Sequence, residues 1–304
     1  MSPKTRAQVK RPRSESPLRK ISSVSSTSST TQDTKPIHIE FPQKLKKLKL
    51  HSSYVASSPF PTFAHPTPAE CLEVHDLLTS HHRTDQTRRP PQDSSNSAET
   101  CGSVPNVIDS LIGTILSQNT SNKNSSAAKR NLDAKFRDFA AIANAPREDV
   151  VEALKHGGLA NKKAKTIQDI LGAIKAKHGD YSLQHLTSPN LSNSEIMQEL
   201  ISYDGVGPKT ASCVLLFCLG RDSFAVDTHV YRLTKILGWV PPKADRVLAQ
   251  AHLDLKVPDE LKYGLHVLLI QHGRACSGCK GGESKGELCV LKKYLREKKG
   301  IKEE

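Results

Sequence analysis

The sequence has few aromatic and hydrophobic residues. Aromatic side chains make up 5% of the 304 residues, with a single tryptophan, and hydrophobic residues make up 36%. Both fractions are below the usual apolar content of a globular chain, so part of the length is expected to lie outside any core. The remainder is still long enough for one large domain or two small ones.

Long hydrophobic runs and a secretory leader are also missing. The longest apolar run, around residues 213–219, is far shorter than the roughly 20 residues that cross a bilayer. The first residues contain no apolar segment of a secretory signal. Seven cysteines, an odd number, favour a reducing compartment over a disulfide framework. We therefore expect neither a membrane protein nor a disulfide-stapled secreted domain.

Acidic residues are outnumbered by basic ones. The chain has 44 Lys and Arg against 31 Asp and Glu, a formal net charge of +13. An excess of this size favours a polyanionic partner, nucleic acid first and an anionic membrane surface second. The membrane surface is disfavoured because the basic runs lack an amphipathic helix with aromatic anchors.

Residues 1–103 are predicted to form a largely disordered tail. Ser and Thr dominate residues 22–34, and a proline-rich segment follows at 59–68. Segments with so few large apolar side chains cannot offset their ordering entropy. Basic runs such as 44–49 are either solvated or serve as a nuclear address or a DNA-binding arm. Helical spacing of apolar residues predicts one short helix over 68–81, which would dock on the domain.

Residues 104–304 are predicted to form an all-α domain. Apolar residues recur at helical spacing from 107 to 116. No alternating strand pattern of any length appears, which excludes a sheet-based fold. The same helical pattern continues in four further segments: 127–139, 147–154, 161–178 and 194–201.

A glycine turn between two helices is the first candidate binding element. Residues 195–218 run from an apolar helix end through Gly205, Val206 and Gly207 into a second helix that starts at Pro208. The glycines let the backbone turn tightly and approach a ligand, and proline is favoured at a first helical position. The amides of that helix start can bind a phosphate. Alone, the pattern is more typical of a plain corner between helices.

Lys209 and Asp227 are the candidate catalytic pair. Lys209 lies in the first turn of the second helix, where the helix dipole disfavours a cation. Partial burial would further favour the neutral, nucleophilic amine. Asp227 follows an apolar approach and starts another helix. Taken singly, a solvated lysine and a helix N-cap are the more common roles of such residues.

The stretch 200–232 resembles the helix-hairpin-helix (HhH-GPD) base-excision DNA glycosylases, specifically their endonuclease III-like branch. The resemblance extends over about residues 107–295 and implies an all-α, two-lobed fold. Three further segments match the family in order. They are 115–120 against its Leu-Ser-x-Gln segment, 158–164 against its Gly-Leu-x-x-x-Lys-Ala turn, and 269–274 against the run before its metal loop.

The resemblance implies a bifunctional DNA glycosylase and AP lyase of base excision repair. The damaged nucleotide is rotated out of the duplex before its base is removed. Lys209 is expected to displace the base through a Schiff base and to cut the strand on the 3′ side by β-elimination. Asp227 would stabilise the oxocarbenium-like transition state or activate the lysine. Oxidised pyrimidine is the default substrate; the alternatives are another base preference or a non-catalytic helix-hairpin-helix DNA-binding module.

The resemblance also implies DNA contacts outside the catalytic pair. Gln118 corresponds to the residue that fills the space left by the flipped base, and a polar helix-end residue is its alternative role. Lys162 and Lys163 are expected to contact phosphates or to form a solvated face. The expected partner is double-stranded DNA with a damaged base or an abasic site, bound by a monomer without membrane contact. The expected location is the nucleus, with the mitochondrion as the alternative.

The cysteine-containing loop at 272–290 departs from the family pattern. Most members of the branch hold a 4Fe-4S cluster on Cys-x6-Cys-x2-Cys-x5-Cys, whereas this loop offers Cys276, Cys279 and Cys289, and the first cysteine has no counterpart. Such a cluster requires four thiolates. We therefore expect no intact 4Fe-4S cluster, no metal and no cofactor. The alternatives are a 4Fe-4S cluster held by this incomplete motif and a zinc site with His272 as the fourth ligand.

Overall fold

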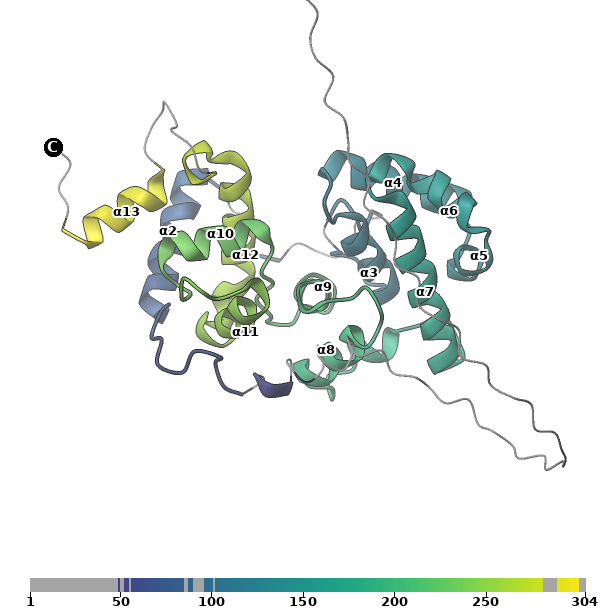
Figure 1. The fold of residues 1–304 in the computed structure, drawn as a ribbon, viewed down its shortest axis with the longest axis horizontal. Helices are drawn as coiled ribbons and strands as arrows, with labels where there is room; N and C mark the ends of the chain where they lie inside the picture. The colour runs from purple at the N-terminus through teal and green to yellow at the C-terminus, as the bar shows by residue number, and fades with distance from the viewer. Residues whose placement is uncertain are drawn as a thin grey trace, which may run out of the picture. The chain divides into compact units, whose positions relative to one another are not determined.

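Helices form the regular secondary structure of the chain. The computed structural model describes residues 49, 52–54, 56–84, 87–89, 96–100, 102–280 and 289–300. Within these ranges every regular element is a helix and none is a strand (Figure 1), which confirms the predicted all-α fold. No helix among them is both long and apolar enough to cross a bilayer. Most of the predicted tail lies outside the described residues.

The first hydrophobic core surrounds α3 (Val107–Leu116). Nine of its 10 residues are buried, because its sequence is almost entirely apolar or small. The helices packed around it are α4 (Asn122–Lys135), α5 (Phe139–Asn144), α6 (Arg147–Leu154), α7 (Ala160–His178) and α8 (Asn193–Ile201), with short 3-10 turns at η1 (Lys155–Gly157) and η2 (Gln184–Thr187). Side-chain caps fix where helices begin: at α8, Ser192 and Glu195 form a reciprocal capping box.

The second hydrophobic core combines a helix from the N-terminal region with helices from the C-terminal half. Its helices are α2 (Pro68–His82), α10 (Thr228–Leu237), α11 (Arg246–Lys256), α12 (Asp259–Ala275) and α13 (Val290–Lys298). A capping box between Thr67 and Glu70 starts α2. Cys71, Val74 and Leu78 of α2 are fully buried, and the helix packs against α12 (Figure 1). The helix that the sequence places in a tail is thus part of a core.

A helical hairpin connects the two cores. Its first helix is α8, and its second is α9 (Pro208–Cys213), which continues into a π-helical turn, η3 (Val214–Cys218). Ala211 and Leu215 join the first core, whereas Leu216 and Phe217 pack toward α12. The second helix of the hairpin therefore lies between the first core and α12, and it sets the spacing between them.

The two glycines of the hairpin turn serve different purposes. Gly205 has a φ of +87°, and a Cβ at this position would lie 2.5 Å from Cγ2 of Thr166 on α7. Gly207 has a φ of −109°, which any residue adopts, and a Cβ there would meet no atom within 4 Å. Packing therefore requires the first glycine, whereas the second leaves the backbone open to a molecule outside the protein.

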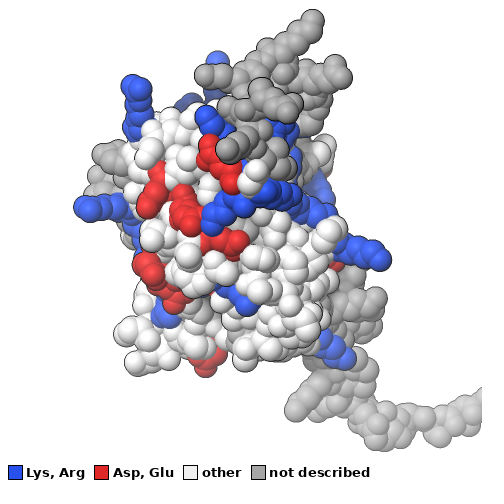
Figure 2. All heavy atoms as spheres, turned by 90° about the vertical axis from the view of Figure 1, so that its left-hand side faces the viewer, with Lys and Arg blue, Asp and Glu red and all other residues white. Residues whose placement is uncertain are grey.

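Charge is mixed on the face of the molecule that Figure 2 shows. Acidic side chains lie next to basic ones there, so the basic excess of the chain does not form one uninterrupted patch on this face. One ion pair between helices of the second core joins Lys298 of α13 to Glu73 of α2 at 2.6 Å. An exposed pair of this kind contributes little to stability.

Gly205→Ala should lower the free energy of unfolding by about 1–2 kcal/mol from backbone strain alone, and by more because of the contact with Thr166. Gly207→Ala is the matched control and should leave stability within about 0.5 kcal/mol of wild type. Urea unfolding followed by circular dichroism measures both. Equal losses for the two variants would contradict the division of roles.

Candidate active site

One cavity lies where the first core, the hairpin and the second core meet. Its volume is about 570 Å³. The residues after α3 form one wall, the glycine turn and the start of α9 form another, and residues at the starts of α10 and α11 and near the end of α12 complete it. Five of the predicted site residues line this cavity: Gln118, Gly205, Gly207, Lys209 and Asp227.

Asp227 caps α10 and also faces the cavity. Its Oδ1 accepts hydrogen bonds from the backbone N–H groups of His229 and Val230, each at 2.8 Å. These bonds hold the carboxylate in one orientation at the positive end of the helix. The N-cap role that the sequence offers as an alternative is therefore present together with a position in the cavity wall.

Lys209 is the second residue of α9 and is half-buried. Pro208 occupies the first helical position and the following Thr210 is 4% exposed, so the backbone on both sides is fixed. The amine shares the cavity with Asp227, and both charges act on the buried imidazole of His266. The three groups are therefore electrostatically linked.

His266 on α12 does not line the cavity but interacts electrostatically with Asp227 and Lys209, and the sequence does not reveal this. It is 1% exposed, and its Nδ1 lies 2.7 Å from the carbonyl oxygen of Ala225, to which it donates. Burial lowers the pKa of His266 to about 4; Asp227 opposes this shift and Lys209 adds to it. The imidazole is therefore neutral at neutral pH. A single histidine on an apolar helix face does not indicate in the sequence that it lies next to a candidate catalytic pair.

Two neighbouring amide side chains line the wall opposite the second core. Gln118 donates from Nε2 to Oγ1 of Thr210 at 3.1 Å, which ties this wall to the residue after Lys209. Asn119 has a left-handed backbone with φ of +51° and lines the same cavity. Asn119 was not among the predicted site residues, although it lies within the matched segment 115–120.

Leu159 is an exposed apolar residue close to this wall. It is 53% exposed and has φ of +53°, a conformation that costs a non-glycine residue about 1–2 kcal/mol. The preceding Gly158 packs close to the turn after α3, since a Cβ there would lie 3.6 Å from the carbonyl oxygen of Asn119. Strain of this kind is typical of functional positions.

Two of the predicted DNA-binding residues are buried. Val206 is 0% exposed, so its side chain anchors the turn in the first core and only the neighbouring glycines line the cavity. Lys163 is 4% exposed, and its Nζ donates to the carbonyl oxygens of Leu116 at 2.7 Å and Gly157 at 2.8 Å. A phosphate contact does not fit this position, because the ammonium already satisfies carbonyls at two helix ends. Lys162 beside it is exposed but does not line the cavity.

Two arginines on the cavity wall complete its electrostatic character. Arg246 begins α11 and Arg274 lies near the end of α12, and both are exposed. Their guanidinium groups can bind phosphates in bidentate fashion. Arg274 lies in the matched segment 269–274, whereas Arg246 has no feature in the sequence that distinguishes it from other surface arginines.

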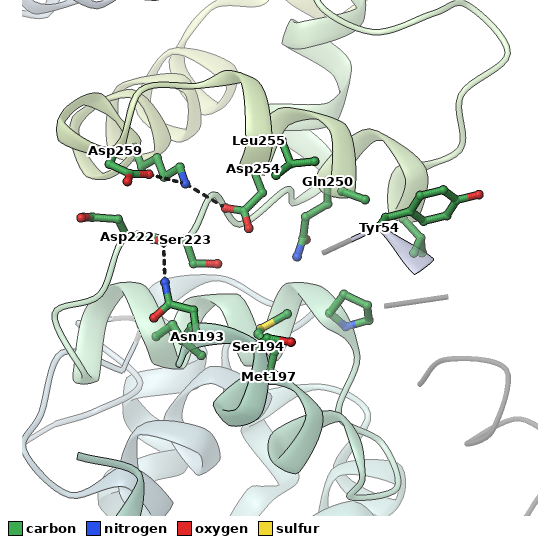
Figure 3. A pocket seen from close by; sticks show the side chains of 15 residues that line it. Tyr54, Asn193, Ser194, Met197, Asp222, Ser223, Gln250, Asp254, Leu255 and Asp259 are labelled. Atoms are coloured by element: carbon green, nitrogen blue, oxygen red, sulfur yellow. Dashed lines mark hydrogen bonds and ion pairs between the residues drawn. The ribbon is translucent and has the colours of Figure 1, made fainter. Parts of the chain in front are cut away.

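A second cavity nearby has the opposite character. Its volume is about 300 Å³, and its lining includes Asp222, Asp254 and Asp259 (Figure 3). Lys262, the one basic residue of this lining among the described residues, is 2.7 Å from Asp259 and 3.5 Å from Asp254. These carboxylates would repel a polyanion. The cavity that contains Lys209 and the two arginines is therefore the better site for a nucleic acid.

Comparison with known proteins relates the chain to base excision DNA repair glycosylases in sequence and in fold. Residues 112–258 match a family model described as "HhH-GPD superfamily base excision DNA repair protein". A putative DNA glycosylase of Arabidopsis thaliana is 39% identical over 77% of this chain and 85% of its own length. Endonuclease III of Thermotoga maritima is 31% identical over 60% and 80%. A trapped endonuclease III-DNA covalent intermediate has a similar fold, with a TM-score of 0.56 and 22% identity over 76% of this chain and 99% of that chain.

Lys163→Met should lower the free energy of unfolding by about 1–3 kcal/mol, because two buried carbonyl groups lose their donor. Burial lowers the pKa of Lys163 from 10.5 to about 8. Between these values the unfolded chain binds more protons than the folded one, so wild type gains stability as pH rises through this window and the variant does not. Denaturant titrations from pH 7 to 10 should show that the difference in unfolding free energy between wild type and Lys163→Met increases with pH.

The neighbouring Lys162→Met variant is the control for this series. Its side chain is exposed, so its stability should stay close to wild type and the difference should not change with pH. A gap for Lys163→Met that is flat or narrows with rising pH would contradict the assigned role.

Proposed function

The chain belongs to the HhH-GPD superfamily of base excision DNA repair proteins, and we propose that it is a bifunctional DNA glycosylase and AP lyase. The observation that carries this proposal is that Lys209 and Asp227 line one cavity together with Arg246 and Arg274. A nucleophile, a carboxylate and phosphate-binding cations are the groups that this chemistry needs. The family's endonuclease III members and the DNA complex with a similar fold support double-stranded DNA as the partner.

The proposed reaction starts at the sugar of a flipped nucleotide. The neutral amine of Lys209 attacks C1′, the N-glycosidic bond breaks, and the base leaves with a proton. The base takes its proton from the new C1′–Nζ ammonium group, and the sugar ring then opens as O4′ takes a proton from solvent, which gives a protonated Schiff base between Nζ and C1′. Loss of a proton from C2′ then expels the phosphate on the 3′ side, which cuts the strand.

The charges around Lys209 suit both halves of this reaction. His266 is neutral and places no positive charge beside the amine of Lys209, while Arg246 and Arg274 of the same cavity can hold the phosphates that flank the reacting sugar. Positive charge develops on the sugar as the base leaves, and the oriented carboxylate of Asp227 stabilises it. Asp227 therefore acts on the transition state more than on the bound substrate.

The rim next to the first core is proposed to hold the distorted duplex. Gln118 and Asn119 present amides that can hydrogen-bond to the unpaired base opposite the lesion. Leu159 presents an exposed apolar side chain of the kind that wedges between base pairs and kinks DNA. Gly207 leaves the backbone open for a phosphate.

Oxidised pyrimidines remain the proposed substrates, and a different base preference is the alternative. The protein is proposed to act as a monomer in the nucleus, with the mitochondrion as the second location. The basic runs that favour a nuclear address lie almost entirely outside the described residues.

Borohydride trapping tests the catalytic proposal. Wild type incubated with duplex that contains thymine glycol or an abasic site, then reduced, should give a covalent protein-DNA adduct. Lys209→Ala should give none while still binding abasic duplex within about tenfold of wild type. Lys235→Ala, a change of an exposed lysine on α10 outside the cavity lining, should trap like wild type. If wild type forms no adduct and binds intact and damaged duplex equally, the protein is a non-catalytic DNA-binding module.

Leu159→Ala should separate base flipping from strand cleavage. Because the side chain is 53% exposed, stability should change by less than about 0.5 kcal/mol. An apolar wedge offsets an unstacking cost of roughly a few kcal/mol, so its loss should slow excision of an intact lesion roughly fivefold or more. Cleavage at a preformed abasic site should change less, since no base has to be extruded. Equal losses on both substrates, measured as kcat/KM, would contradict the wedge role.

A further inference from the structure

Four side chains that could bind a metal converge at the end of α12. The ligand atoms of His272, Cys276, Cys279 and Cys289 all lie within 4.8 Å of one another. Nε2 of His272 is 3.4 Å from Sγ of Cys289 and 3.5 Å from Sγ of Cys279, and these two sulfurs are 3.0 Å apart. His272, Cys279 and Cys289 are 0%, 2% and 4% exposed. Polar groups are seldom gathered in a core in this way without a shared partner.

The backbone of the site comes from three consecutive elements. Cys276 ends α12, Cys279 ends the 3-10 turn η4 (Ser277–Cys279), and Cys289 caps the start of α13. The turn packs tightly against the third cysteine, because a Cβ on Gly278 would lie 3.1 Å from Cβ of Cys289. Two cysteines separated by two residues are a common half-site for a tetrahedral metal.

The second ring nitrogen of His272 is already engaged. Its Nδ1 lies 3.1 Å from Nε2 of His82 on α2. This contact orients the ring so that Nε2 faces the cysteines, and metal-binding histidines typically have their other nitrogen held by such a partner. The second core thus brings a residue of its N-terminal helix, α2, against a ligand on a helix of its C-terminal half, α12.

A 4Fe-4S cluster, which the resemblance implies for this loop, does not fit the donor set. Such a cluster is typically held by four thiolates, and the group contains three. The other described cysteines, Cys71, Cys213 and Cys218, lie elsewhere in the structure and are not part of it. One zinc ion with Zn–S of about 2.3 Å and Zn–N of about 2.0 Å would hold its ligand atoms about 3.4–3.8 Å apart. The ligand atoms of this group lie close to that spacing. A 4Fe-4S cluster binds each thiolate to a different iron and would therefore hold the sulfurs farther apart.

We propose that His272, Cys276, Cys279 and Cys289 bind one structural Zn²⁺ in tetrahedral Cys₃His coordination, in place of the iron–sulfur cluster. The ion would join α12, η4 and α13 and so stabilise the second core. It would also fix the position of Arg274, which lies between His272 and Cys276 and reaches the active-site cavity. The role is structural, because all four ligands come from the protein and none is left for substrate.

Metal analysis of the full chain tests this proposal without reference to activity. Protein produced with a tag that contains no histidine, and purified both in air and anaerobically, should contain about one Zn per chain and no iron by mass spectrometry. Reconstitution with Co²⁺ should give the thiolate-to-cobalt and d–d absorption bands of a tetrahedral site. Removal of Zn²⁺ by a chelator should lower the melting temperature.

Variants assign the ligands. Cys289→Ser and His272→Ala should each lower the affinity for Zn²⁺ by roughly tenfold or more. Cys71→Ala removes a fully buried cysteine from the same core and should keep its zinc, which controls for general loss of packing. Four irons with sulfide in the anaerobically purified protein, a Cys279–Cys289 disulfide in that same protein, or wild type without bound zinc would overturn the proposal. Unchanged zinc affinity in His272→Ala would also overturn it.

Discussion

The packing of α9 and its π-helical continuation between the first core and α12 is the constraint on which the cavity that contains Lys209 and Asp227 depends. The residues after Lys209 are buried from Thr210 to Cys218, so the helix cannot shift without disturbing both sides. The hydroxyl groups of Ser212 and Ser223 are 2.6 Å apart, which ties α9 to the segment that leads to Asp227. The spacing between lysine and carboxylate is thus set by packing well away from the cavity.

Electrostatics selects between the two cavities that this packing creates. Pro208, Val247 and Gln250 line both, so the cavities are neighbours around the same helix start. One is lined by arginines and the other by carboxylates, and a DNA backbone is attracted by the first and repelled by the second. A phosphate chain is therefore attracted to the cavity that contains Lys209 and repelled by the acidic one.

The fold and the centre of the site could be predicted from the sequence because both depend on local pattern. Apolar residues at helical spacing indicate the helices, and the glycine turn with Lys209 and Asp227 stands in short motifs of known order. The residues that were missed depend on which elements meet in space. Lys162 and Lys163 are adjacent in the sequence, yet only the second points at two helix ends. The contact of His266 with Ala225 and the position of Arg246 in the cavity wall likewise depend on residues far apart in the chain, and periodicity carries no information about them.

The two cores differ in how their residues are distributed along the chain. The first is built from one continuous stretch, from Ala98 to Cys218, whereas the second joins Cys71, Val74 and Leu78 of α2 to residues from Phe224 to Leu291. During synthesis the first core can form as soon as its own stretch has emerged, but α2 has to wait for its partners near the C-terminus. Residues of α10, α11 and α12 complete the wall of the cavity, so the cavity forms only after nearly the whole chain has been made. A nascent or truncated chain would therefore present a folded first core in which the cavity around Lys209 is still incomplete.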